Sequence, residues 1–457
     1  MAIDVVILAA GKGTRMKSSL PKVLHPLAGK PLLGHVIDTA KTLPDASISV
    51  VIGHGSEQIS QTFANDDIQW ISQHQQLGTG HAVQQAAPFI HDKSVVLVLY
   101  GDVPLIAATT LSQLVEKVSD SSMALLTVTM ADPTGYGRIL RNQQGAVVAI
   151  VEEKDATPEQ KLIPEVNTGV MALQAEKLKT WLPQLENNNA QGEYYLTDLI
   201  AIAAQAGIQI ASLQPANSME TQGVNSRSQL HQLERYCQYQ QAEKLMAAGV
   251  TIADASRFDC RGSLRCGADS FIDINAVFEG DVVLGANVSI GANCTIKDAV
   301  IGDNVVIKAN TVIEGPVTLE DNVDVGPFAR LRPGTVLRKA ARIGNFVETK
   351  KADIGAGSKV NHLSYIGDAT IGDHANIGAG TITCNYDGVN KFQTRIGDGA
   401  FIGSNTALVA PVSVGKNATV GAGSTITRDV AADNLAVARA RQKNLDGWQR
   451  PQKLKKD

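Results

Sequence analysis

The feature that most constrains the fold of this 457-residue chain is a six-residue repeat of aliphatic side chains in its second half. Each aliphatic residue is usually followed by glycine or by a small or polar residue. A hexapeptide period is typical of a parallel β-helix, in which one repeat forms a flat face and three repeats form a coil. The aliphatic side chains then stack in the interior, and the length of the repeat predicts roughly eight to nine coils. With occasional one-residue skips, the repeat runs through Leu284, Ile290, Ile296, Ile301, Ile307, Ile313, Leu319, Val325, Leu331, Leu337, Ile343, Ile354, Val360, Ile366, Ile371, Ile377, Ile402, Leu408, Val414, Val420 and Ile426.

One interruption of the repeat lies between Thr383 and Ile396, where the spacing expands to thirteen residues. The extra residues read "CNYDGVNKFQTR" and include Tyr386 and Lys391. A regular solenoid accommodates an insertion only as an excursion on its surface, and such excursions often form binding sites. We therefore expect a surface excursion that takes part in binding.

The repeat also stops after Ile426, so we expect the last segment, 427–457, to form an arm and not another coil. The arm contains Arg439 in a cationic cluster, which is compatible with a solvated basic tail. It also carries Leu435, Val437 and Trp448, which is more apolar anchoring than a disordered tail needs.

The first half has a different pattern, because strand-like runs alternate with helical stretches. The continuous aliphatic run Val5–Leu8 is typical of a strand that is buried on both faces. Such alternation predicts a Rossmann-like α/β domain over 1–226, with a mostly parallel sheet and helices on both faces. Residues 227–248 lack proline and glycine and predict a linker helix, which leaves 249–457 for the repeat domain and its arm. Further strand-like runs lie at Ile48–Ile52, Val95–Tyr100, Ala124–Met130 and Ile208–Leu213.

The composition narrows the class of protein. A net charge of −4 provides no broad basic surface, so nucleic-acid binding has no electrostatic support. No apolar run is long enough to cross a bilayer, and the start "MAIDVV" lacks a signal-peptide pattern, so we expect a cytoplasmic protein. The five cysteines are odd in number and have no paired metal-ligand spacing, which favours reduced thiols over disulfides or a zinc site.

The first strand is followed by the loop "AAGKGTRM", which lies at the sheet edge where α/β proteins bind ligands. The loop lacks the third glycine of a dinucleotide fingerprint and the Gly-Lys-Ser/Thr ending of a P-loop. Its two glycines, Gly11 and Gly13, allow backbone N–H groups to approach an anion, while Lys12 and Arg15 supply positive charge. An ordinary tight turn between a strand and a helix is the alternative.

A carboxylate also follows a buried strand, in "VLYGDVP", where Asp102 ends the run. A carboxylate that faces a glycine and lysine loop suits a magnesium nucleotide, because it holds the hard cation while the cation neutralises phosphate oxygens. By itself Asp102 is compatible with a simple turn former. Together with "PKVLH", "QLGTGHA" and "GYGRI", it favours a nucleotide site.

These motifs, with "NTGVM" and "GVNSR" ahead of a hexapeptide domain, closely resemble one bacterial family over nearly the whole chain. It is the family of bifunctional N-acetylglucosamine-1-phosphate uridylyltransferases/glucosamine-1-phosphate N-acetyltransferases. The resemblance implies an enzyme that makes UDP-N-acetylglucosamine for peptidoglycan and lipopolysaccharide. It also implies a left-handed β-helix and a homotrimer with acetyl-transfer sites between subunits.

The resemblance further implies a set of residues for UTP, the sugar phosphate and magnesium in the first domain. A sugar-phosphate oxygen attacks the α-phosphorus in line, so the site must orient and neutralise charge more than supply a strong base. Arg15 and Lys22 would add positive charge, and Asp102 and Asn225 would bind Mg²⁺. The implied nucleotide residues are Leu8, Ala9, Ala10, Gly11, Gln73, Gly78, Thr79, Tyr100, Gly101 and Asp102, and the sugar residues are Gly137, Glu152 and Asn167.

In the second domain, the stretch "GNFVETKKADIGAGSKVNHLSYIGDATIG" places His362 near lysines and a tyrosine. Acyl transfer to an amine needs a general base near neutral pH, which histidine can provide, although a histidine at a coil turn is often simply solvated. The resemblance assigns His362 this role. It also implies contacts of Arg332, Lys350, Tyr365 and Asn376 with the sugar phosphate, and of Ala379, Asn385, Tyr386, Ser404, Ala422 and Arg439 with acetyl-CoA.

Two alternatives stay open at this point. Sugar-nucleotide pyrophosphorylases also join a nucleotidyltransferase domain to hexapeptides, but they do not need the set around Lys350, His362 and Tyr386. A non-catalytic assembly subunit could keep the fold as a scaffold, but it would not need Lys22 and Asp102.

Overall fold

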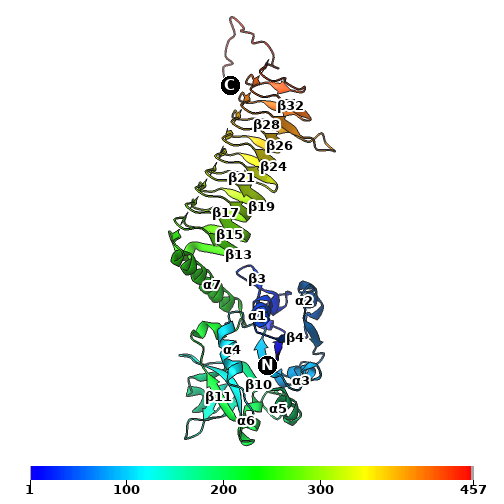
Figure 1. Ribbon diagram of the computed structural model, residues 1–457, viewed down its shortest axis with the longest axis vertical. Helices are drawn as coiled ribbons and strands as arrows, with labels where there is room; N and C mark the ends of the chain where they lie inside the picture. Colours follow the sequence, from blue (N-terminus) through cyan, green and yellow to red (C-terminus); the bar gives the residue numbers. More distant parts are fainter. Residues whose placement is uncertain (1, 454–457) are drawn as a thin grey trace. The chain divides into compact units, whose positions relative to one another are not determined.

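The first strand in the computed structural model, which describes residues 2–453, is β1 (Ile3–Ala9), and each of its residues is buried. It is an interior strand, between β6 and β4, of a sheet with the order β11-β7-β10-β6-β1-β4-β5 (Figure 1). The pairs of β1 with β4 and β6, of β4 with β5 and of β7 with β11 are parallel, whereas β10 runs antiparallel to β6 and β7. The predicted mostly parallel sheet is therefore confirmed. Its strands are β4 (Ala46–Ile52), β5 (Gln69–Ser72), β6 (Val95–Tyr100), β7 (Ser122–Thr129), β10 (Glu165–Gln174) and β11 (Gln209–Leu213), with the hairpin β8 (Arg138–Arg141) and β9 (Val147–Val151) beside β10 and a separate short pair β2 (Pro26–Leu27) and β3 (Lys30–Pro31).

Helices cover both faces of this sheet because alternate residues of β1 point to opposite sides. Val5 and Ile7 belong to one apolar cluster, and Val6 and Leu8 belong to the other. The first cluster contains side chains of α1 (Leu32–Lys41), α2 (Ser56–Thr62) and α4 (Ala108–Glu116), and the second contains side chains of α3 (Thr79–Ala86), α5 (Ala175–Trp181) and α6 (Asp198–Gln205). Residues at the carboxyl ends of β1 and β6 line a cavity.

The predicted linker helix is α7 (Arg227–Ala247), one residue shorter than expected. The division between the two compact units falls inside it, since one unit extends to Cys237 and the other begins at Gln238. Leu233 packs with Met16 and Leu27 of the first unit, whereas Leu245 belongs to the core of the second. Among the described residues, no helix is both long and apolar enough to span a membrane.

The second unit is a parallel β-helix (Figure 1), and every aliphatic residue of the predicted repeat is at most 4% exposed. One face is a parallel sheet of β12 (Thr251–Ile252), β14 (Phe271–Ile272), β16 (Ser289–Ile290), β18 (Val306–Ile307), β20 (Asp324–Val325), β23 (Arg342–Asn345), β25 (Lys359–His362), β27 (Asn376–Ile377), β30 (Phe401–Ile402), β33 (Thr419–Val420) and β35 (Leu435–Ala436). The other strands are β13 (Phe258–Cys266), β15 (Ala276–Leu284), β17 (Thr295–Ile301), β19 (Val312–Leu319), β21 (Arg330–Leu331), β22 (Thr335–Leu337), β24 (Glu348–Ile354), β26 (Tyr365–Ile371), β28 (Ile382–Cys384), β29 (Thr394–Ile396), β31 (Ala407–Val409), β32 (Val412–Val414) and β34 (Thr425–Ile426).

Within the described residues, the number of levels exceeds the expected eight to nine, because the first face has 11 strands, one from each level. The repeat is hard to see in the first levels, where Phe258, Cys260 and Phe278 fill the interior in place of regularly spaced aliphatic residues. The two phenylalanine rings contact each other with centroids 5.9 Å apart. Cys260, Cys266, Cys294 and Cys384 are thiols, and burial raises the pKa of Cys260 to about 11.

The prediction that the arm begins directly after Ile426 is wrong. Val430 is buried and pairs with Val414, and β35 pairs with β33, so the stack continues for part of another coil. The six-residue repeat is not visible after Ile426, because the backbone still pairs there but buried aliphatic side chains are mostly absent. Leu435, Val437 and Trp448 are 68%, 53% and 67% exposed, so the predicted apolar anchoring is not made within one chain.

The excursion between β28 and β29 is confirmed. A bridge between Tyr386 and Lys391 closes its turn, and the Asp387 carboxylate accepts hydrogen bonds from the N–H groups of Val389 and Asn390. Tyr386 is 58% exposed where the turn closes. The coil resumes in register at Thr394, which pairs with Ala369.

Candidate active sites

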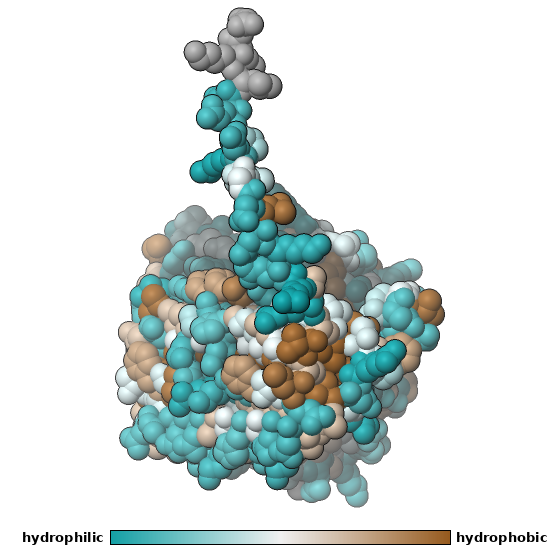
Figure 2. Space-filling view, turned by 90° about the horizontal axis from the view of Figure 1, so that it is seen from above, coloured by the Kyte–Doolittle hydropathy of each residue, from teal (hydrophilic) through white to brown (hydrophobic). Residues whose placement is uncertain are grey.

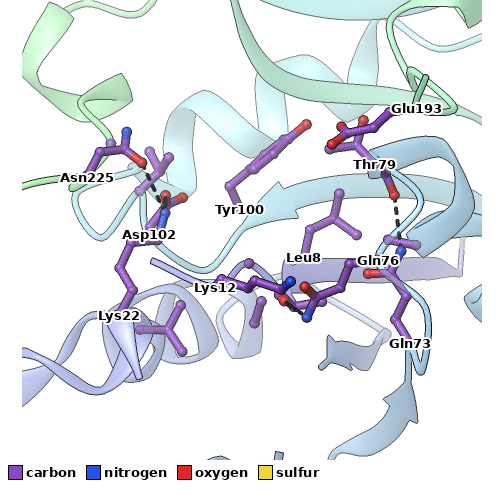
Figure 3. A pocket seen from close by; sticks show the side chains of 18 of the residues that line it. Leu8, Lys12, Lys22, Gln73, Gln76, Thr79, Tyr100, Asp102, Glu193 and Asn225 are labelled. Atoms are coloured by element: carbon purple, nitrogen blue, oxygen red, sulfur yellow. Dashed lines mark hydrogen bonds and ion pairs between the residues drawn. The ribbon is translucent and has the colours of Figure 1, made fainter. Parts of the chain in front are cut away.

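A cavity of about 590 Å³ lies at the carboxyl ends of β1 and β6 in the first unit (Figure 3). It contains a large part of the residues predicted for the nucleotide site, together with residues that the sequence motifs did not indicate. The predicted residues that line it are Leu8, Ala9, Ala10, Gly11, Lys12, Lys22, Gln73, Gly78, Thr79, Tyr100, Asp102 and Asn225; the others are Val23, Gln76, Ala82, Val103, Tyr136, Thr168, Glu193, Thr221 and Gly223.

The glycine loop after β1 serves two different purposes. Gly13 has φ 58°, and a Cβ there would lie 2.7 Å from the Cβ of Lys22, so both conformation and packing require glycine. A Cβ on Gly11 would meet no atom within 4 Å, so protein packing does not require glycine where the loop lines the cavity. Its absence of a side chain leaves space for a ligand. Lys12 lines the cavity, whereas the predicted Arg15 is exposed outside its lining.

One end of the cavity is marked by three polar side chains (Figure 3). The Lys22 ammonium group contacts the Asp102 carboxylate and donates a hydrogen bond of 3.1 Å to Asn225 Oδ1. The N–H of Val224 donates to the carbonyl of Asp102 at 2.9 Å, which holds the Asn225 segment against the end of β6. Two oxygen atoms from distant segments thus converge on one cationic group.

The other end of the cavity is built by Gln73, Gln76 and the turn before α3. Gln73 is buried and donates to the carbonyl of Gly78 at 3.1 Å, and Gln76 donates to the carbonyl of Ala10 at 2.9 Å. Gly78 has φ 110°, and a Cβ there would lie 2.6 Å from the carbonyl oxygen of Tyr194. Gln76 was detectable, because it begins the motif "QLGTGHA", but no local signal connects Glu193 to this cavity.

The predicted sugar residues form a neighbouring group. Gly137 accepts a hydrogen bond from the N–H of Asn167 at 2.8 Å, and a Cβ on Gly137 would lie 3.3 Å from a carboxylate oxygen of Glu152. Glu152 accepts a hydrogen bond from Thr197, and burial raises the pKa of its carboxyl group. Burial also raises the pKa of Tyr100, and the carboxylates of Glu152 and Asp102 act in the same direction. Tyr100 therefore lies within electrostatic reach of both groups of residues.

On the β-helix, three cationic side chains gather around β24. Arg332 donates to Glu348 at 2.8 Å, and this hydrogen bond raises the pKa of its guanidinium group. The ammonium group of Lys391, from the excursion, lowers the pKa of Lys350, and Arg332 contributes to the same shift. Such a cluster favours an anion. Lys391 was noticed in the sequence only as part of the excursion.

His362 lies at the end of β25 and is exposed. It stands opposite Asn345 in the register of β23 and β25, and its Nδ1 is 2.8 Å from Asn345 Oδ1. An amide oxygen accepts a hydrogen bond, so this contact favours the tautomer of the neutral ring in which Nδ1 carries the proton and Nε2 keeps its lone pair. Tyr365 follows at the start of β26, and Asn376 at the start of β27 pairs with Lys359 of β25.

The predicted acetyl-CoA residues lie on adjoining levels. The carbonyl of Ala379 accepts from the N–H of Asn405 at 2.7 Å, and that of Ser404 accepts from Gly423 at 2.8 Å, which stacks one corner of the coils. Arg439 donates to the carbonyl of Ala422 at this corner. In the excursion, Asn385 is buried and donates to Asp368 at 2.6 Å, while Tyr386 is exposed.

Comparisons with known families agree with both units. Residues 5–166 match the MobA-like NTP transferase domain. Residues 265–298 and 298–333 match the bacterial transferase hexapeptide (six repeats), and residues 393–428 match the hexapeptide repeat of succinyl-transferase. A nucleotidyltransferase unit followed by a hexapeptide-repeat acyltransferase unit is the class of enzyme that these halves define.

Relatives that span the whole chain narrow this class to one family. Bifunctional protein GlmU of Marinobacter nauticus is 60% identical over 451 residues, which cover 99% of each chain. The proteins of the same name from Cellvibrio japonicus and Idiomarina loihiensis are 61% and 59% identical, and the alignments cover 98% and 100% of this chain and 99% and 100% of theirs. The chain belongs to the GlmU family of bifunctional enzymes, and it is a uridylyltransferase and an acetyltransferase.

Proposed function

We propose that the β-helix acetylates glucosamine 1-phosphate with acetyl-CoA, and that the first unit then transfers UMP from UTP to N-acetylglucosamine 1-phosphate and releases pyrophosphate. The product, UDP-N-acetylglucosamine, would serve the synthesis of peptidoglycan and lipopolysaccharide. The observation that carries this proposal is the presence, in one chain, of the cavity with Lys22, Asp102 and Asn225 and of His362 beside a cationic cluster. Nucleotide and acetyl-CoA substrates and thiol cysteines support a cytoplasmic location.

Uridylyl transfer requires that a sugar-phosphate oxygen attacks the α-phosphorus of UTP while pyrophosphate leaves. Gln73, Gly78 and Thr79 would hold the base, and Lys12 and Lys22 would neutralise the phosphates. Gly137, Glu152 and Asn167 would hold the sugar. These residues orient the two substrates, and no strong base is needed.

The residues around Lys22 fit a magnesium ion, because the hard oxygens of Asp102 and Asn225 already converge on a positive group. We propose that these two residues hold Mg²⁺. When bound, the ion supplies charge neutralisation of phosphate oxygens. Lys22 would then direct its charge to the nucleotide.

Acetyl transfer requires that the amine of glucosamine 1-phosphate attacks the thioester carbonyl, forming a C–N bond while the C–S bond breaks. Nε2 of His362 would take the proton from the amine, and its partner Asn345 would hold the ring in the tautomer that leaves Nε2 basic. Arg332, Lys350 and Lys391 would bind the sugar phosphate. The coenzyme A thiolate leaves and takes up a proton.

The direct test is to assay the two half-reactions separately with the purified full chain. UTP, N-acetylglucosamine 1-phosphate and Mg²⁺ should yield pyrophosphate, and glucosamine 1-phosphate with acetyl-CoA should yield a new thiol. Pyrophosphate release without any thiol release would identify a pyrophosphorylase that transfers no acetyl group. Neither activity would favour a scaffold.

We also propose that the chain forms a homotrimer through an apolar ridge, which consists of Phe328, Phe346 and Leu363 on three successive levels. Their side chains are 50%, 55% and 63% exposed, and the two phenylalanine rings stack with centroids 5.4 Å apart. All three residues have positive φ, of 56°, 54° and 50°, a conformation that costs an L-residue about 1–2 kcal/mol. Burial against another subunit would offset both the strain and the exposure.

The ridge adjoins the proposed acetyl-transfer site, because Leu363 directly follows His362. Figure 2 shows that apolar side chains also gather in patches on the face of the molecule that it presents. At the same kind of turn in other coils, Asn293 and Asn310 occupy the left-handed conformation. Phe328, Phe346 and Leu363 thus replace the usual asparagine at this turn, which supports a subunit contact near the site.

Phe346→Asn should therefore dissociate the trimer and lower acetyl transfer, while uridylyl transfer continues. Asparagine tolerates the positive φ, so the coil itself should lose no stability. Sedimentation analysis and both assays check this prediction. Phe271→Asn, which changes a 38% exposed phenylalanine of β14, is the control and should stay trimeric. A trimeric, fully active Phe346→Asn variant would contradict the role of the ridge.

A second prediction concerns the arm. Arg439→Ala should raise the KM for acetyl-CoA about 10-fold or more, because a guanidinium group binds phosphate oxygens through a fork of N–H groups. Truncation after Ala438 should have a similar effect and spares β35, which the structure shows to be part of the stack. Arg428→Ala, at an exposed position, is the control. An unchanged KM in both variants would remove Arg439 from the site.

A further inference from the structure

Arg138 is one of the most deeply buried large side chains of the chain, with only 1% of its surface exposed. Its Nη2 donates to Glu153 Oε2 at 2.7 Å, and its Nη1 donates to the carbonyl of Tyr136. Its Nε has no hydrogen-bond partner among the residues that the structure describes. A buried guanidinium group with an unsatisfied N–H lowers stability, so its presence calls for an explanation.

Glu153, the partner of Arg138, makes a second contact with the turn 135–137. Its Oε2 also accepts a hydrogen bond from the N–H of Gly135 at 3.3 Å, and Arg138 holds the pKa of this carboxyl group below its usual value. Lys161 adds a carbonyl that accepts from Nη2 at 3.4 Å. The ion pair therefore fixes the backbone of the turn 135–137 at two points.

This turn and the strand opposite carry the proposed sugar contacts. Arg138 follows Gly137, and Glu153 follows Glu152, so the ion pair joins the chain directly behind these two residues. In the hairpin of β8 and β9, Arg138 stands opposite Val151, which places the pair at the hairpin end where Gly137 and Glu152 approach each other. Tyr136, whose carbonyl Arg138 holds, lines the nucleotide cavity.

We propose that Arg138 and Glu153 are positioning residues for the sugar phosphate in uridylyl transfer. Neither needs to touch the substrate. Arg138 holds the turn 135–137, and Glu153 holds β9, so that Gly137, Glu152 and Tyr136 keep a fixed separation. This inference rests on the proposed function, because the sugar contacts are part of it.

The test compares Arg138→Met, Arg138→Lys and Glu153→Gln with the unchanged protein in uridylyl transfer, with the KM measured separately for each substrate. Misplacement of substrate-binding groups costs roughly 10-fold to 10²-fold, and we expect a rise of that size in the KM for N-acetylglucosamine 1-phosphate. The KM for UTP should change less, by about twofold at most. Arg138 holds Tyr136 of the nucleotide cavity, whereas Gln73 and Gln76 are held at the other end of the cavity by the carbonyls of Gly78 and Ala10. Arg138→Lys keeps the charge but not the fork, so it should not restore the KM.

The matched control is Arg141→Met in the same strand β8. Arg141 makes a forked pair with Glu165, at 2.8 Å and 2.7 Å, toward the other end of the strand. This variant should leave both KM values close to those of the unchanged protein. The control therefore distinguishes the specific loss of the Arg138–Glu153 pair from the loss of an ion pair elsewhere in the hairpin.

Three results would overturn the inference. The first is an unchanged KM for the sugar phosphate in Glu153→Gln, which tests the pair even if Arg138→Met does not fold. The second is an equal rise in both KM values, which would show a general loss of structure. The third is an equal effect of Arg141→Met. Failure of the unchanged protein to form UDP-N-acetylglucosamine would instead refute the proposed function itself.

Discussion

Asp102→Ala is expected to lower uridylyl transfer by about 10³-fold or more, while acetyl transfer stays close to normal. The carboxylate of Asp102 contacts Lys22 and lies beside Asn225 at the end of β6, where the proposed metal and phosphates would meet. Loss of this carboxylate removes the negatively charged partner of Lys22 and of the proposed Mg²⁺. Pyrophosphate release measures the first reaction, and thiol release measures the second in the same sample.

The control for this variant is Asp92→Asn, which changes an exposed carboxylate that also pairs with a lysine, Lys179. It should leave both activities unchanged. Equal loss of both activities in Asp102→Ala would indicate a folding defect. Retained uridylyl transfer would remove Asp102 from the metal site.

His362→Ala is expected to lower acetyl transfer by about 10²-fold to 10⁴-fold, the usual effect of removing a general base. Uridylyl transfer from supplied N-acetylglucosamine 1-phosphate should continue, because its residues lie in the other compact unit. The hydrogen bond to Asn345 predicts a smaller loss for Asn345→Ala, since that change removes only the orientation of the ring.

A matched control is His374→Asn, which changes another exposed histidine of the β-helix. His374 has φ 55°, and asparagine tolerates that conformation, so the coil should be preserved. Near-normal release of coenzyme A by His362→Ala would show that the base assignment is wrong. A loss in His374→Asn as large as in His362→Ala would point to the coil and not to the base.

The β-helix could be predicted from sequence because aliphatic side chains recur in its interior at a fixed spacing. The interior positions from Leu284 to Ile426 are all buried. The first and last levels of the β-helix were missed because other side chains, or few buried ones, occupy the interior there. Phe258 and Phe278 fill the first levels, and Val430 is the main buried side chain after Ile426, so backbone pairing extends the stack beyond the visible period.

The nucleotide cavity could be predicted only in part. Glycine motifs at strand ends were visible, because glycine marks close approach of the backbone. Contacts between distant segments were not visible. Gln76 donates to the carbonyl of Ala10, and Glu193 belongs to a loop whose next residue, Tyr194, exchanges backbone hydrogen bonds with Leu77 and Gly80. Lys391 likewise reaches Lys350 only after the excursion folds back.

The central claim is that one chain performs both reactions in order, and the most direct measurement is a time course with the full chain. Glucosamine 1-phosphate, acetyl-CoA, UTP and Mg²⁺ are mixed, and thiol and pyrophosphate are followed separately. We predict thiol release without a lag and independent of UTP, followed by pyrophosphate release that lags and requires acetyl-CoA. Pyrophosphate formed at full rate without acetyl-CoA, or no thiol at all, would contradict the account.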